Sequence, residues 1–331
     1  MLSRSLPDLV EDSKIEADFL DSCTRHVVYE SGETPSSRPL HKEERWQRQS
    51  ILGRGGYGMV HLERCITGND NRVRAVKEII KDIIVRLEND WISELEAVFK
   101  FSHPKYRHCF VRSEAWYELN GRIFMAMEFM PLGDPQTNLQ DKPLSEFEGR
   151  QIIEQVLEAV GFMHNSGFLH QDLKPSNIMV VSRAPTWYVR VADFGISRRL
   201  RDSDTSAFIP RGTLGYTAPE VFSIIPDQRC SVSADMWSLG CVVYKILTGT
   251  LPFPQIIDLA TYCHGLSKFP RDPLHSCKVS DYGQDFIIKL IQARSQDRLT
   301  ATSAARHPWI TTSLDPSAPR PRSRRAIFPH I

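Results

Sequence analysis

Short stretches in the first half of the chain alternate apolar and polar residues, which is the pattern of half-buried β-strands. Three such stretches lie at 51–52, 59–62 and 73–79, and turns rich in glycine or Asn-Asp separate them. Apolar residues then recur at helical spacing over 92–99. The pattern predicts a small antiparallel sheet followed by one helix, whose polar face includes Glu94.

In the second half of the chain the helical period dominates. Ser145 followed by Glu148 has the spacing of a capping box, and the apolar stripe after it predicts a helix that ends near Gly167. Residues 233–247 are apolar around most of the helical circumference, which is typical of a buried helix, and Gly249 can end it. A larger, mainly helical part is therefore expected.

The two ends of the chain lack sustained apolar periodicity. Residues 1–45 are rich in serine and charged residues, and they predict a mostly disordered leader. Residues 313–331 alternate proline with arginine, a pattern that resists helix formation and attracts acidic surfaces. We interpret them as a basic, proline-rich tail; a solvated tail is the favoured interpretation, and a nuclear-import signal is the alternative.

Composition narrows the possible partners and location. The 41 lysines and arginines nearly cancel the 40 aspartates and glutamates, so no overall charge attracts the chain to nucleic acid or to an anionic membrane. The seven cysteines form no CxxC pair, and an odd number cannot all pair within one chain, which favours a reducing compartment. No apolar run approaches membrane-spanning length. We expect a cytoplasmic or nuclear protein with neither nucleic acid nor membrane as a partner.

The segment with the clearest chemistry is His-Gln-Asp-Leu-Lys-Pro-Ser-Asn at 170–177, which Asp-Phe-Gly follows at 193–195. Asp172 could accept the proton of a substrate hydroxyl. Asn177 and Asp193 offer the hard oxygen ligands that Mg²⁺ prefers. One base and two metal ligands within a short region predict phosphoryl transfer.

A glycine-rich segment at 53–58 predicts a phosphate-binding hairpin, because glycines let backbone amides approach phosphate oxygens without a Cβ in the way. The glycines are Gly53, Gly55, Gly56 and Gly58. Alone this motif is weak, because a helix after it would indicate a dinucleotide-binding fold instead. Here 59–62 continues as a strand and Lys77 follows nineteen residues after Gly58.

Together these landmarks resemble the eukaryotic protein kinases over about residues 46–312. The resemblance implies a bilobal α+β protein kinase fold. A small antiparallel sheet lobe with one helix and the hinge would occupy 46–130, and a larger, mainly helical lobe would occupy 131–312. It also implies ATP and Mg²⁺ as cofactors. The run Gly-Thr-Leu-Gly-Tyr-Thr at 212–217 is most similar to the calmodulin-dependent kinase group.

For the phosphate end of the ATP site, the resemblance implies a lysine paired with a helix glutamate. Lys77 matches the lysine that binds the α- and β-phosphates. Glu94 is the favoured partner because it lies nine residues before His103-Pro104, and Glu96 is the competing candidate on another helix face.

For the adenine end, the resemblance implies that backbone groups of Glu128 and Met130 meet the purine edge and that Met127 is the gatekeeper. Apolar residues would cover the purine ring from above and below. The residues implied to do so are Leu52, Val60, Ala75 and Met179.

In the catalytic loop, the resemblance implies that Lys174 neutralises charge on the transferring phosphate beside Asp172, as in serine and threonine kinases. Thr213 resembles the threonine that contacts this loop, which supports the same hydroxyl specificity. The structural residues implied are Glu220 paired with Arg298, and Asp235 as an anchor of the loop backbone.

Gln171 departs from the family pattern, in which many members carry arginine. That arginine normally binds a phosphate on the activation segment, and a neutral glutamine cannot replace it. Our hypothesis is that activity does not depend strongly on phosphorylation of that segment. The residues available for it are Ser203, Thr205 and Ser206.

The resemblance also bears on substrates and regulators. Ser176 and Lys245 stand where kinases that favour basic residues carry acidic groups, so only Asp134 supports such a preference. Thr217 argues against a proline-directed enzyme. No long basic amphipathic helix is expected at 313–331, so the tail offers no obvious calmodulin site.

Two other functions remain as alternatives. A small-molecule phosphotransferase has a similar catalytic loop, but such enzymes generally lack the Ala-Pro-Glu segment at 218–220. A pseudokinase scaffold is the non-enzymatic alternative, and the four residues expected for catalysis argue against it. These are Lys77, Asp172, Asn177 and Asp193. The favoured function is a serine/threonine protein kinase that acts on protein hydroxyls.

Overall fold

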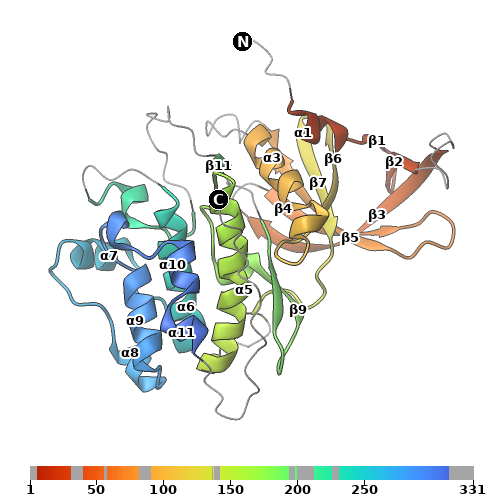
Figure 1. The fold of residues 1–331 in the computed structure, drawn as a ribbon. Helices are drawn as coiled ribbons and strands as arrows, with labels where there is room; N and C mark the ends of the chain where they lie inside the picture. Colours follow the sequence, from red (N-terminus) through yellow and green to blue (C-terminus); the bar gives the residue numbers. More distant parts are fainter. Residues whose placement is uncertain are drawn as a thin grey trace.

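The computed structural model describes residues 6–30, 40–55, 58–81, 91–135, 137, 142–193, 198–199, 212–225 and 231–312. A lobe built on one β-sheet lies beside a larger helical lobe (Figure 1). The predicted α+β architecture with two lobes is therefore confirmed. Among the described residues, none of the helices combines the length and the apolar character needed to cross a membrane.

The small lobe contains a seven-stranded sheet in the order β1-β2-β3-β4-β5-β7-β6, and every neighbouring pair is antiparallel. Its strands are β1 (Glu16–Phe19), β2 (Thr24–Glu30), β3 (Leu40–Gly55), β4 (Gly58–Cys65), β5 (Val73–Ile80), β6 (Ser113–Leu119) and β7 (Arg122–Glu128). The three stretches predicted as strands lie within β3, β4 and β5, so the predicted antiparallel sheet is confirmed.

The predicted helix after the third strand is α3 (Trp91–Phe101). Leu95, Val98 and Phe99 are buried, and they pack into the main apolar core. Glu94 lies in the first turn, on the same element. The burial of this apolar stripe fixes the rotation of the helix about its axis, and so decides which way Glu94 points.

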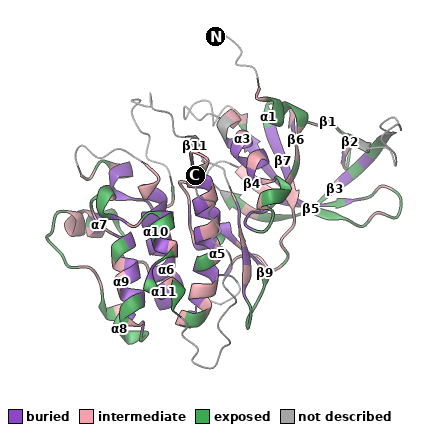
Figure 2. Ribbon diagram, viewed as in Figure 1, coloured by how far each residue is buried: buried purple, intermediate pink, exposed green. Residues whose placement is uncertain are grey.

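The large lobe is organised around α5 (Glu146–Asn165) and α6 (Ser233–Thr248). At the start of α5, the Ser145 hydroxyl accepts from the Glu148 amide and the Glu148 carboxylate accepts from the Ser145 amide, which confirms the predicted capping box. Nearly every residue of α6 is buried. In contrast, α5 carries buried, intermediate and exposed residues (Figure 2). Gly249 ends α6 at φ 75°, a left-handed conformation that favours glycine.

The remaining elements after α3 lie between α5 and α6 or follow α6, except the 3₁₀ turn η1, which lies between α3 and β6. The short strands are β8 (Phe168–Leu169), β9 (Ile178–Ser182), β10 (Tyr188–Val191) and β11 (Arg198–Arg199). The other helices are α7 (Ile256–Cys263), α8 (Asp272–Ser276), α9 (Asp281–Leu290), α10 (Ala301–Ala305) and α11 (Pro308–Thr311). The 3₁₀ turns are η1 (Pro104–Tyr106), η2 (Pro175–Asn177), η3 (Pro219–Phe222) and η4 (Ser295–Asp297).

The expectation of a mostly disordered leader over 1–45 is wrong for the described residues of that range. They form α1 (Asp8–Asp12), β1, β2 and the start of β3. The missing apolar periodicity has a physical cause: the buried face of β2 consists of Thr24 and His26, which are polar. Residues 1–5 and 31–39, and the tail at 313–331, lie outside the described residues.

Candidate active site

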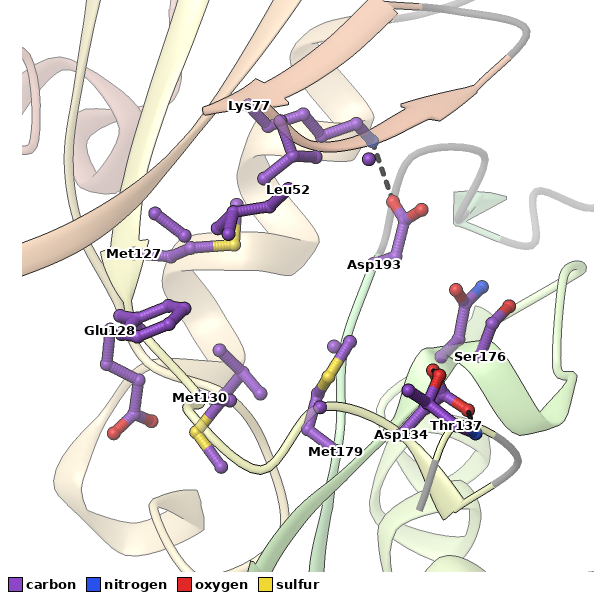
Figure 3. Close-up of a pocket in the computed structure, with 18 of the residues that line it drawn as sticks. Leu52, Lys77, Met127, Glu128, Met130, Asp134, Thr137, Ser176, Met179 and Asp193 are labelled. Atoms are coloured by element: carbon purple, nitrogen blue, oxygen red, sulfur yellow. Dashed lines mark hydrogen bonds and ion pairs between the residues drawn. The ribbon is translucent and has the colours of Figure 1, made fainter. Parts of the chain in front are cut away.

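A cleft with a volume of about 560 Å³ contains most of the residues predicted for the site. Its walls come from the sheet, from the segment after β7, from the loop before β9 and from the residues after β10 (Figure 3). The predicted ATP-site residues that line it are Leu52, Gly53, Gly58, Val60, Ala75, Lys77, Met127, Glu128, Met130 and Met179. The predicted catalytic and metal residues that line it are Asp172, Lys174, Asn177 and Asp193.

The glycine-rich segment is the hairpin between β3 and β4, where Gly55 pairs with Gly58. A Cβ on Gly58 would lie 1.8 Å from the carbonyl oxygen of Glu78, so only glycine fits there. Gly53 has open space around it, as a backbone that approaches a ligand requires. Gly56 lies outside the described residues.

Lys77 reaches from β5 toward two carboxylates on different elements. Its Nζ lies 2.7 Å from Oδ1 of Asp193, shown as a dashed line in Figure 3, and 3.3 Å from Oε1 of Glu94. The structure thus places Glu94 beside Lys77, and the helix that carries it lies close to the cleft. Glu94 itself stays behind Lys77, outside the cleft lining.

The three charges shift one another's pKa. Burial raises the pKa of Glu94 to about 7; the Lys77 ammonium lowers it and the Asp193 carboxylate raises it. For Lys77, burial alone lowers the pKa, but Asp193 and Glu94 outweigh burial and the net direction is upward. Lys77 therefore remains a cation at neutral pH, and Asp193 competes with Glu94 for it.

The carboxylate of Asp172 is held on both oxygens. Lys174 donates to its Oδ2 at 2.7 Å, and the Thr213 hydroxyl donates to its Oδ1 at 2.7 Å. Lys174 also donates to Thr213 Oγ1 at 2.7 Å, which closes a three-membered network. Asn177 donates through Nδ2 to the backbone oxygen of Asp172 at 2.8 Å. This network fixes the position of the carboxylate that faces the cleft.

Asp235, on the buried helix α6, anchors the catalytic loop from below. It accepts from the backbone amides of His170 at 2.9 Å and Gln171 at 2.8 Å, and from the His164 ring at 2.8 Å. Burial raises the pKa of Asp235, but the His164 hydrogen bond and charge outweigh it, so the net shift is downward. Gln171 adopts φ 68°, a strained backbone conformation that these bonds hold in place.

Glu220 and Arg298 form a fully buried bidentate ion pair. Arg298 donates to the two carboxylate oxygens at 2.6 and 2.7 Å, and it also donates to the backbone oxygen of Ser233 at 2.9 Å. The pair ties the Ala-Pro-Glu segment at 218–220 to the body of the lobe. Since both charges are shielded from water, each depends on the other.

Asn177 and Asp193 fit a hard divalent cation such as Mg²⁺. Both line the cleft, and both offer oxygen. The hydrogen bonds of the Asn177 side chain leave from its amide nitrogen, so the oxygen is the atom left for a cation. Asp193 keeps a side chain 40% exposed at φ 60°, beside the cation Lys77.

Two features of the site were not predicted from the sequence. Arg190 donates to both carboxylate oxygens of Glu128 at 2.8 Å and so braces the segment after β7. The pair is separated by 62 positions, so no local pattern could have indicated it. Val111 and Ala192 also line the cleft, and no sequence motif indicated either residue. The predicted phosphorylation sites lie outside the described residues; these are Ser203, Thr205 and Ser206.

Comparison with known proteins places these features in context. Residues 46–310 match the model of the protein kinase domain. The chain is 34% identical over 276 residues to the serine/threonine-protein kinase RAD53 of Saccharomyces cerevisiae, which covers 80% of this chain and 32% of that protein. It is 30% identical over 271 residues to calcium/calmodulin-dependent protein kinase type 1 of Macrobrachium nipponense, which covers 81% of this chain and 76% of that protein. It is 28% identical to the serine/threonine-protein kinase cds1 of Schizosaccharomyces pombe, over 79% of this chain and 57% of that protein. The chain thus spans about a third of the yeast RAD53 protein.

Proposed function

Because the chain belongs to the protein kinase family, we propose that it transfers the γ-phosphoryl group of ATP to serine and threonine hydroxyls of proteins. One observation carries the proposal: the Asp172 carboxylate, held by Lys174 and Thr213, faces the same cleft as Lys77 and Asp193. Two of the relatives named above, RAD53 and cds1, are serine/threonine-protein kinases, which supports the same specificity here.

The nucleotide would lie with its adenine toward the segment after β7. Backbone groups of Glu128 and Met130 would meet the purine edge, and Met127 would limit access behind it. Apolar side chains would cover the ring, namely Leu52, Val60, Ala75 and Met179, and all of them line the cleft. The phosphates would then reach the hairpin between β3 and β4 and the Lys77 ammonium.

In the transfer step, the substrate hydroxyl oxygen bonds to the γ-phosphorus while the bond from that phosphorus to the bridging oxygen breaks and ADP leaves. Asp172 accepts the hydroxyl proton, and Lys174 lies where it can offset negative charge on the transferred group. The network with Thr213 keeps both side chains in place before substrate arrives.

Asn177 and Asp193 are the proposed Mg²⁺ ligands. When bound, Mg²⁺ neutralises charge on the phosphate oxygens and holds them in a geometry suited to in-line transfer. This chain would present two oxygen donors at the same end of the β9–β10 hairpin, because Asn177 precedes β9 where Ile178 pairs with Val191 and Asp193 follows β10. Lys77 lies next to Asp193.

Protein substrates are favoured over small molecules because the Ala-Pro-Glu segment at 218–220 is fixed by the Glu220–Arg298 pair. We propose no direct control by calmodulin. A cytoplasmic or nuclear location agrees with the six described cysteines, all of which are free thiols.

The experiment that tests the proposed function compares wild-type chain with Asp172→Asn, using purified protein, Mg²⁺, labelled ATP and a degenerate peptide library. Loss of a positioned base lowers kcat by about a hundredfold to ten-thousandfold. ATP affinity, measured by calorimetry, should be retained because Asp172 does not bind the adenine. Asp272→Asn is the matched control on an exposed residue of α8. Equal transfer by wild type and Asp172→Asn, or label on neither serine nor threonine, would contradict the proposal.

A further inference from the structure

Residues 6–30 precede the matched kinase domain, which begins at residue 46, yet they contact the helix that carries Glu94. We call residues 6–30 the belt. Figure 1 shows α1 of the belt beside α3 and β6, while β1 and β2 form the far edge of the same sheet. The belt therefore connects two distant parts of the small lobe.

At one end, the belt packs on α3 through Val10. Val10 is fully buried although the rest of α1 is exposed, and it belongs to the same apolar core as Leu95 and Val98 of α3. Its backbone oxygen accepts from Nε1 of Trp116 at 2.6 Å. The Trp116 ring in turn lies 6.0 Å from the ring of Trp91, the first residue of α3. Val10 and Trp116 together form a support behind the turn of α3 that carries Glu94.

Backbone hydrogen bonds hold this support in place. The Trp116 amide donates to the Ser13 oxygen at 3.1 Å, and the Ile15 amide donates to the Trp116 oxygen at 2.9 Å. The ammonium of Lys14 lies over the Trp116 ring at 5.1 Å. These bonds attach the belt to β6 over several consecutive residues, so Val10 cannot shift without breaking them.

At the other end, the belt pairs with the strand that leads into the glycine hairpin. The pairing joins the whole of β2 to β3, and β3 continues to Gly53. On the inner side, the fully buried His26 lies 2.9 Å from Arg74, which also pairs with Glu63. The belt thus connects the support of α3 to the phosphate-binding hairpin.

We propose that the belt is a positioning element for phosphoryl transfer: through Val10 and Trp116 it holds α3 where Glu94 reaches Lys77. This inference rests on the proposed function. The support comes from the chain itself and needs no phosphate on the activation segment, in agreement with the neutral Gln171. Val10 and Trp116 are positioning residues, because they act on the reaction only through α3.

The experiment uses the full chain and a matched pair of substitutions on α1. Val10→Asp introduces a charge into the contact with α3, whereas Leu9→Asp introduces the same charge at a residue 45% exposed. We expect Val10→Asp to lower kcat by about three- to thirtyfold, the usual range when coupling through a packed element is lost. KM for ATP should change much less, because the adenine contacts are remote from α1. Leu9→Asp and the conservative Val10→Ile should match wild type.

Amide hydrogen exchange provides a second measurement that does not depend on activity. Val10→Asp should accelerate exchange over 91–101, while the amides of α6 remain protected. Unchanged kcat, or a lower kcat with wild-type exchange in α3, would overturn the proposal. If α6 also lost protection, Val10→Asp would have unfolded the chain, and Trp116→Phe would be measured instead. This variant removes the hydrogen bond to the Val10 oxygen and keeps an aromatic ring. A wild-type kcat in Trp116→Phe would overturn the proposal.

The same measurements separate this inference from the proposed function. Should wild-type chain transfer no phosphate to any peptide, the proposed function fails, and the belt loses its role in transfer. Exchange over α3 would then still report whether the belt holds the helix. If wild type is active and Asp172→Asn is inactive, the proposed function stands, and a negative result for Val10→Asp contradicts only the role of the belt.

Discussion

The two lobes hold their catalytic residues in different ways. In the small lobe, the partners of the Lys77 ammonium among the described residues are two side chains, Glu94 on α3 and Asp193 after β10. In the large lobe, Asp235 of the buried helix α6 accepts from the backbone amides of the two residues before Asp172. Asn177 donates to the backbone oxygen of Asp172 itself. The first arrangement can be opened by moving one helix, whereas the second can be opened only by disrupting the core. Regulation of the proposed phosphoryl transfer is therefore expected to act on the small lobe.

The largest expected effect is on the stability of the large lobe. Arg298→Met leaves the buried Glu220 carboxylate without its partner, and the free energy of unfolding should fall by about 3–5 kcal/mol. Urea unfolding followed by tryptophan fluorescence measures it. Arg294→Met is the control, because Arg294 is exposed on the neighbouring turn. A loss no larger than that of the control would show that this lobe is not braced by the pair.

The ion pair of the small lobe should affect rate more than stability. Glu94→Gln removes the charge that holds Lys77 from the α3 side, and kcat should fall by about ten- to hundredfold, as for a lost charge-assisted hydrogen bond. Glu96→Gln, two positions away on another face of α3, is the matched control and should remain near wild type. Steady-state kinetics with a peptide from the library would decide. If kcat fell further in Glu96→Gln than in Glu94→Gln, Glu96 and not Glu94 would be the functional partner of Lys77.

Two buried groups of the small lobe should give opposite pH dependence of stability. Burial lowers the pKa of His26 to about 3, and Arg74 adds to the shift. Because the folded state resists protonation of His26, the free energy of unfolding has its full value for this group above pH 6.5 and decreases as the pH falls. Burial raises the pKa of Glu94 to about 7, so the folded state binds a proton more readily and loses stability as the pH rises above 4.5. Between pH 4.5 and 6.5 the two slopes oppose each other, each at about 1.4 kcal/mol per pH unit.

Single substitutions should separate these slopes. In urea unfolding at three pH values, the stability of His26→Gln relative to wild type should increase as the pH falls from 6.5 to 4.5. The stability of Glu94→Gln relative to wild type should decrease over the same interval, because wild type gains from protonating Glu94. Parallel curves for all three proteins would contradict the assigned shifts.

The sequence predicts the catalytic loop of the large lobe better than it predicts the belt of the small lobe. The catalytic loop depends on residues close together in sequence, so Asp172 and Asn177 could be proposed from their residue types and spacing, and Lys174 from the family resemblance. The belt could not be predicted in this way, because the buried residues of its strand β2 are the polar Thr24 and His26. The buried His26 ring is hydrogen-bonded to Arg74, which lies 48 positions away in the sequence. Apolar periodicity detects burial only where burial is apolar.

The remaining site features follow from long-range geometry. Glu94 and Glu96 are equivalent by composition, and only the buried stripe of α3 decides which one meets Lys77. The Arg190–Glu128 pair joins a strand of one lobe to the end of a strand of the other, so neither residue has a local signal. Motifs identify the chemistry, and packing decides which of the available side chains can perform it.

The smallest expected effect tests whether the large lobe needs a phosphate at all. Replacing the three hydroxyl residues Ser203, Thr205 and Ser206 with alanine should change kcat by less than about threefold, because Gln171 carries no charge to bind a phosphate there. Gln171→Arg supplies the missing cation, so in that background the same replacements should lower kcat further than they do in wild type. Turnover measured for all four proteins gives the coupling between the two changes. If the alanine replacements abolished turnover in a folded wild-type background, the phosphate would be required through some other cation, and the support of α3 by the belt would be insufficient for activity.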